Sequence, residues 1–212
     1  SLSPNHPVTR GTAQNPDIYF QTREACNPFY EKIVPIVEEY MGKISALTGR
    51  SYNLFSYYGA EDAKYVIVAM GSVCGTIEET IDYLNAQGEK YGLVKVHLFR
   101  PFSIKHFCAA VPDTAERIAV LERTKEPGAP GEPLYLDVRN SFYGKPDAPM
   151  IIGGRFGLGS KDTTPADIKA VFDHLKCSLP KTGITVGIED DVTHTSRPVP
   201  EKLVTAKAGT VR

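Results

Sequence analysis

The sequence has no excess of charge of one sign, no long apolar run and no closely spaced cysteines. Its 212 residues include 24 Lys and Arg against 25 Asp and Glu, a formal net charge of −1. Because nucleic acids and anionic membranes are bound by clustered basic residues, neither is an expected partner. No apolar stretch approaches the roughly 20 residues of a membrane-spanning helix, and no signal peptide is recognisable. We therefore expect a water-soluble, cytoplasmic protein.

The four cysteines, Cys26, Cys74, Cys108 and Cys177, lie far apart in the sequence. Metal ions and iron–sulfur clusters need grouped thiolates, such as C-x-x-C pairs. This spacing predicts neither a metal site nor a cluster within the chain. Mostly buried, free thiols in a reducing compartment are the better interpretation.

The N-terminal part of the chain differs from the rest. Residues 1–21 are polar and rich in Pro, Asn and Thr, which predicts an extended segment lying on a neighbouring surface. A helix is predicted next, with Asn27 as N-cap and Gly49 at its end. Pro35 predicts a kink near residue 32. Because the chain begins without Met, we expect it to be a piece of a longer protein.

From about residue 59 the sequence alternates between apolar runs and helical patterns. Two S/T-x-x-E/D capping boxes, Thr76 with Glu79 and Thr164 with Asp167, mark expected helix starts. Strands are predicted at residues 65–70, 93–99, 117–122, 150–153 and 184–189, and helices at 76–87, 103–110, 133–142 and 164–175. Five strands alternating with four helices predict an α/β fold, a three-layer parallel sheet with helices on both faces.

Ligands of such sheets bind outside the carboxyl ends of the strands, so the loops there are candidate sites. The loop at 70–76 lacks G-x-G-x-x-G spacing and is followed by Glu78 and Glu79, which favours a structural turn over a dinucleotide site. The acidic end Glu189–Asp191 indicates a solvated strand end, because adjacent side chains point to opposite faces. The five histidines have no partner at a catalytic spacing.

Two other loops carry basic residues. The loop at 153–161 combines glycines with Arg155 and Lys161, but it has no Walker A spacing and its glycines end before the expected helix start. Either this loop binds an anion, or its glycines allow another domain to approach closely. The Pro- and Gly-rich loop at 123–133, with Arg123 and Lys125, is either a stiff connection or a surface for a protein contact. The residues alone therefore indicate an α/β domain without a catalytic site of its own.

Six runs of the sequence carry a family resemblance: Leu2–Pro7, Thr9–Gln21, Leu47–Tyr52, Arg123–Pro133, Gly154–Lys161 and Val186–Thr193. Together they resemble pyruvate:ferredoxin (flavodoxin) oxidoreductase, over essentially the whole chain. By this resemblance, residues 1–58 are the tail of the first, pyruvate-side domain. Residues 59–195 are similar to the C-terminal domain of transketolases. Residues 196–212 are a linker toward a CoA-binding domain that lies outside the chain.

The resemblance implies a parent enzyme that oxidises pyruvate to acetyl-CoA and CO2 with thiamine diphosphate and Mg²⁺. Electrons then pass through [4Fe–4S] clusters to ferredoxin or flavodoxin. It also implies that the second domain binds no cofactor, packs against other domains of the parent and shapes its homodimer. Cluster-binding cysteine runs and a G-D-G…N motif are absent from this sequence. No residue is therefore assigned a catalytic, cofactor or metal role, and the isolated chain is predicted to be inactive.

Two alternatives stay open. The chain is an anion- or CoA-binding module that uses the loops at 123–133 and 153–161, with Arg123, Lys125, Arg155 and Lys161 as ligands; or it is a flavodoxin-like electron carrier. If the chain is a packing domain, we expect an exposed apolar patch above roughly 600 Å² and a tendency to self-associate.

Overall fold

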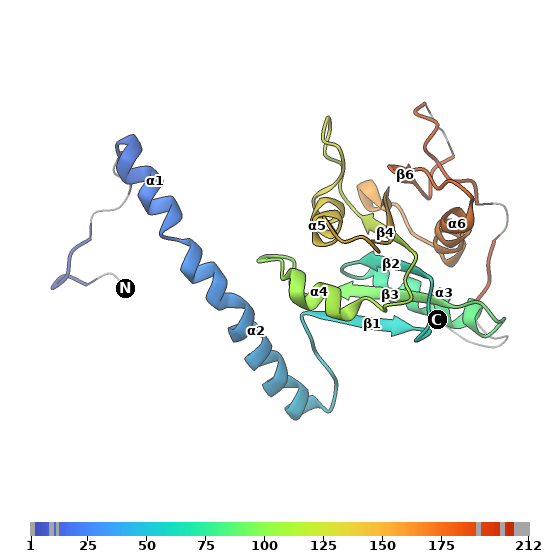
Figure 1. Ribbon diagram of the computed structural model, residues 1–212, viewed down its shortest axis with the longest axis horizontal. Coiled ribbons are helices and arrows are strands. Elements are labelled where there is room, and N and C mark those ends of the chain that lie inside the picture. Colours follow the sequence, from blue (N-terminus) through green and yellow to red (C-terminus); the bar gives the residue numbers. More distant parts are fainter. Residues whose placement is uncertain (1–2, 9–10, 12, 190–191, 200–201, 206–212) are drawn as a thin grey trace.

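The computed structural model describes residues 3–8, 11, 13–189, 192–199 and 202–205. Two N-terminal helices form a rod that stands away from an α/β unit (Figure 1). The helices are α1 (Pro16–Glu24), α2 (Asn27–Thr48), α3 (Val73–Asn85), α4 (Ile104–Ala110), α5 (Pro133–Ser141), the 3₁₀ turn η1 (Leu158–Ser160) and α6 (Pro165–Lys176). The strands are β1 (Phe55–Gly59), β2 (Tyr65–Ala69), β3 (Tyr91–Val96), β4 (Arg117–Glu122), β5 (Met150–Arg155) and β6 (Ile184–Thr185).

The sheet has the strand order β1-β3-β2-β4-β5-β6. The five predicted strands are parallel, and a sixth strand, β1, joins the edge antiparallel to β3 with Phe55 opposite Val96. The predicted five-stranded parallel sheet is therefore one strand too small. The predicted domain boundary between residues 58 and 59 falls inside β1, so the sheet unit begins near residue 54.

Side chains alternate along β2 and fill a core on each face of the sheet. Ile67 belongs to the cluster covered by α3 and α6, and Val66 and Val68 belong to the cluster covered by α4 and α5. All three are fully buried. Each such side chain contributes about 1.5–3 kcal/mol to folding through the hydrophobic effect. The predicted three-layer α/β class is thus confirmed.

The N-terminal rod was only partly predicted. Asn15 caps α1, because its Oδ1 accepts a hydrogen bond from the backbone N–H of Ile18 at 2.9 Å. This helix begins within the segment predicted to be extended, residues 1–21, and runs three residues past its end, although Asn-Pro-Asp is a recognisable helix start. In α2 the N-cap position is Cys26 rather than Asn27. Gly49 ends α2 in the left-handed conformation as predicted.

The two predicted capping boxes have different outcomes. In α6 the Asp167 carboxylate accepts from the Thr164 backbone N–H at 2.8 Å, and the Thr164 hydroxyl accepts from the Asp167 N–H at 3.3 Å. The box predicted at Thr76 is wrong, because α3 begins three residues earlier, at Val73. Starting there places the largely buried side chains of Val73 and Cys74 against the core.

The C-terminal segment stays close to the sheet. Strand β6 is shorter than predicted, and Gly187 has a φ of 82° soon after it. Ser196 bridges to Thr185, and the Arg197 N–H donates to the Thr185 carbonyl at 2.8 Å. The start of the predicted linker therefore lies on the sheet unit. Asp190, Asp191 and residues 206–212 lie outside the described residues.

Candidate functional site

The loop at 123–133 is held at its base by a buried carboxylate, Glu122, at the carboxyl end of β4. Its two oxygens accept hydrogen bonds from the backbone N–H groups of Leu134 and Tyr135, at 2.8 and 2.9 Å. These donors belong to the first turn of α5, whose N–H groups have no partner within the helix. Burial raises the pKa of Glu122 although both hydrogen bonds favour its charged form.

A second buried carboxylate, Glu132, closes the other end of this loop. The Arg155 guanidinium lies 3.5 Å from it and the Lys125 ammonium 3.9 Å from it. Arg155 also donates a hydrogen bond to the Gly183 carbonyl at 2.8 Å. Two of the four basic residues predicted for an anion site are thus brought together, but around a carboxylate of the chain itself.

The other two predicted cations do not join this group. The Arg123 guanidinium donates to the Gly157 carbonyl at 2.8 Å and to the Ser160 hydroxyl at 3.2 Å, which links the two loops. Lys161 is exposed and lines a different cleft of about 1000 Å³ beside the start of α6. Arg123 and Arg155 therefore hold the loops in place through hydrogen bonds and an ion pair. An anionic ligand bound beside Arg155 would be repelled by the negative charge of Glu132. An anion site made by these four residues stays a prediction.

Neither the histidines nor the cysteines form a recognisable reaction centre. No three His, Cys, Asp or Glu residues of the described ranges are grouped as metal ligands. The His106 ring lies 3.0 Å from Glu38 and 2.6 Å from the Ser103 hydroxyl, which ties α4 to α2. The cysteines are free as predicted, but the expectation that they are mostly buried is wrong, because only Cys74 is fully buried.

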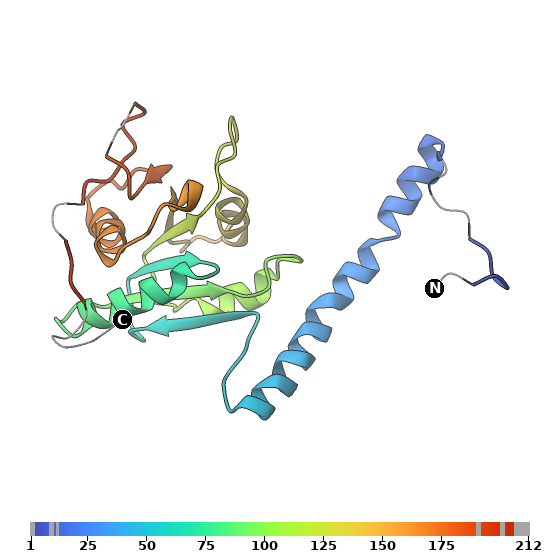
Figure 2. The same cartoon turned by 180° about the vertical axis from the view of Figure 1, so that it is seen from behind.

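The rod carries a large exposed apolar surface. Val34, Val37 and Met41 pack against the sheet unit, but α2 contains no fully buried residue. A second row, here called the outer stripe, recurs at helical spacing and consists of Phe29, Ile36, Tyr40, Ile44 and Leu47. Its side chains are 47–86% exposed. No helix of the described residues is both long and apolar enough to cross a membrane. Figure 2 shows from behind how far the rod extends from the sheet.

Comparison with solved structures gives only partial superpositions. A 2-oxoglutarate:ferredoxin oxidoreductase from Magnetococcus marinus is 22% identical, with a TM-score of 0.44 over 62% of this chain and 20% of that one. A transketolase mutant from Pichia stipitis gives a TM-score of 0.27. Superpositions of this extent do not establish a common fold.

Comparison of sequences is far more specific. The chain is 65% identical to a pyruvate-flavodoxin oxidoreductase from Klebsiella pneumoniae over 198 residues, 93% of this chain and 17% of the relative. It is 55% identical to a pyruvate:ferredoxin oxidoreductase from Moorella thermoacetica over 212 residues, which are 100% of this chain and 18% of that relative. The chain thus spans under a fifth of the length of these relatives. The model of pyruvate:ferredoxin oxidoreductase core domain II matches residues 63–168. The chain belongs to the pyruvate:ferredoxin oxidoreductase core domain II family.

Proposed function

We propose that this chain is a structural part of a pyruvate:ferredoxin or pyruvate:flavodoxin oxidoreductase, which packs domains and subunits together and has no catalytic site of its own. The observation that carries this proposal is the outer stripe of α2. Five large apolar side chains on one helical face are exposed, and each contributes about 1.5–3 kcal/mol when buried. A surface of this kind is typical of an interface.

In this proposal the parent enzyme oxidises pyruvate to acetyl-CoA and CO2 in the cytoplasm, as a homodimer. Thiamine diphosphate, Mg²⁺, the [4Fe–4S] clusters and CoA are held by other domains, and ferredoxin or flavodoxin accepts the electrons. Residues 1 to about 53 then belong to the preceding domain, and the sheet unit from residue 54 onward is the second domain. The small share of each relative that the chain spans supports its being part of a larger enzyme, and the pairing of β1 with β3 supports the boundary near residue 54.

The absence of a catalytic site is tested on the isolated chain. Mixed with pyruvate, thiamine diphosphate, Mg²⁺, CoA and oxidised ferredoxin, it should release no CO2. Turnover above the protein-free control would refute the proposal.

The packing role is tested in the full-length oxidoreductase that contains this sequence. Leu47→Asp places a charge in the outer stripe, and Ala46→Asp places the same charge on an exposed neighbouring position of α2 outside the stripe. Burying an unpaired carboxylate costs several kcal/mol. We expect Leu47→Asp to lower thermal stability or dimer content clearly more than Ala46→Asp does. Equal behaviour of the two variants would exclude the outer stripe as an interface.

A further inference from the structure

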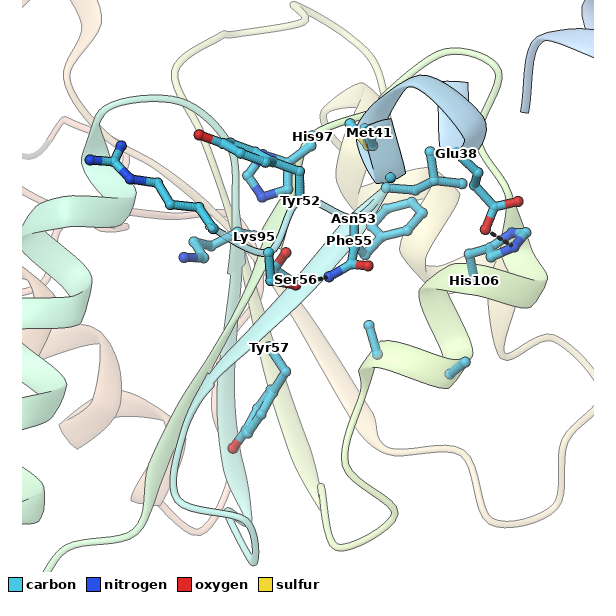
Figure 3. Close-up of a pocket in the computed structure, with 16 residues that line it drawn as sticks. Glu38, Met41, Tyr52, Asn53, Phe55, Ser56, Tyr57, Lys95, His97 and His106 are labelled. Atoms are coloured by element: carbon cyan, nitrogen blue, oxygen red, sulfur yellow. Dashed lines mark hydrogen bonds and ion pairs between the residues drawn. The ribbon is translucent and has the colours of Figure 1, made fainter. Parts of the chain in front are cut away.

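A cleft of about 730 Å³ lies where α2, the connection after it, the edge strand β1 and the end of β3 meet (Figure 3). Its lining includes Arg50 and Tyr52 from the connection, Ser56 from β1, and Lys95 and His97 at the end of β3. None of these residues belongs to the loops at 123–133 and 153–161.

The sheet register places two of these side chains together, and a third follows the end of β3. Ser56 pairs with Lys95 across the antiparallel ladder, and directly paired residues share a face of the sheet. His97 is the first residue after β3 and lines the same cleft. In Figure 3, Tyr52 lies beside the cleft over the end of this strand pair.

Several polar groups of the cleft have no partner. The side chains of Arg50, Tyr52, Ser56 and His97 make no hydrogen bond or ion pair with any residue in the described part of the chain. Lys95 of the cleft differs from these four residues, because it pairs with Glu78, as Lys64 pairs with Glu116 and Lys90 with Asp62. The cleft therefore offers a set of free hydrogen-bond donors.

The charges around the cleft leave Arg50 without a counter-ion. Lys95 is 2.6 Å from Glu78, and Glu38 on the other wall is 3.0 Å from the His106 ring. Burial, and secondarily the Lys95 ammonium, lower the pKa of His97. Both effects favour the neutral form of the His97 ring.

We propose that this cleft binds a small molecule through an oxyanion group, phosphate or carboxylate, with Arg50 as the principal ligand and His97 and Lys95 as supporting donors. A guanidinium matches the paired oxygens of both groups and forms charge-assisted hydrogen bonds with them. The hydroxyl groups of Tyr52 and Ser56 supply further donors. The cleft has the volume of a small-molecule site. This site is separate from the packing role and does not depend on it.

Titration calorimetry of the 212-residue chain with inorganic phosphate and, separately, with malonate tests the site and distinguishes the two groups. We expect saturable binding of at least one anion, weakened about tenfold by Arg50→Gln, the loss expected for one charge-assisted hydrogen bond. The control is Arg23→Gln, which removes the same charge from an exposed position of α1 far from the cleft. Absence of saturation with both anions, or equal weakening by the two variants, would overturn the proposal.

A second measurement needs no variant and so does not depend on how Arg50→Gln folds. The bound anion should raise the pKa of His97, followed by NMR of its imidazole protons, because a negative neighbour favours the protonated ring. The pKa of His174, which is not in the cleft, should stay the same. An unchanged pKa of His97 at saturating phosphate and malonate would contradict the assignment.

Discussion

Glu122→Leu gives the sharpest test of how the loop at 123–133 is held. The substitution introduces an apolar side chain of similar size at a position that is 3% exposed, and removes both acceptors of the Leu134 and Tyr135 N–H groups. Those residues are themselves 0% and 3% exposed, so water cannot readily replace the carboxylate. An unsatisfied buried donor costs about 1–3 kcal/mol. We expect two such donors to lower the free energy of unfolding by about 2–6 kcal/mol, a large part of the ~5–15 kcal/mol of a typical domain.

Urea unfolding followed by circular dichroism measures this loss as a lower midpoint with an unchanged slope. Glu122→Gln retains one acceptor oxygen and removes the buried charge, so its loss should be smaller. The control is Glu126→Gln, at an exposed position of the same loop, which should change stability by less than about 0.5 kcal/mol. If Glu122→Leu were as stable as this control, the two hydrogen bonds would not be what fixes the loop.

Two further perturbations test other parts of the fold. Burial lowers the pKa of His174, so the folded chain binds this proton less tightly than the unfolded chain. The free energy of unfolding should therefore fall as pH drops below about 6.5, and level off below the folded pKa. His174→Gln should reduce that slope in urea titrations at several pH values; an unchanged slope would show that other groups cause it. Gly59 has a φ of 123°, and an added Cβ would overlap the Tyr91 carbonyl, so Gly59→Ala should cost about 2 kcal/mol or more. Gly42 lies inside α2 with open space around it, so Gly42→Ala should instead stabilise the fold by about 0.5–1 kcal/mol. Equal urea midpoints for Gly59→Ala and Gly42→Ala would refute the claim that Gly59 occupies a strained position.

Local patterns were sufficient where one segment decides its own structure. The apolar run of β2 and the capping box at Thr164 are of this kind, because a continuous apolar run and a reciprocal cap are both visible in consecutive residues. The antiparallel pairing of β1 was missed because β1 is a short strand whose partner, β3, begins more than 30 residues later. Edge pairing is set by tertiary contacts rather than by propensity.

The arrangement of charges was the least predictable part. Arg155 and Lys161 look equivalent in a glycine-rich loop, yet only Arg155 reaches a buried carboxylate. The residues around Glu132 do not indicate that it is buried. A buried glutamate needs a charged partner, and here that partner, Arg155, lies 23 residues further along the chain. The cleft that joins Arg50 to His97 arises only when β1 pairs with β3, which explains why the sequence directed attention to other loops.

The short connection between α2 and β1 limits how the rod can move. Phe55 is six residues after Gly49, and a fully extended chain spans about 3.3–3.6 Å per residue. The end of α2 therefore stays within about 20 Å of the edge strand β1, even without any side-chain contact between them. A displacement of α2 by a neighbouring domain would therefore pull directly on β1 and reshape the cleft that this connection lines.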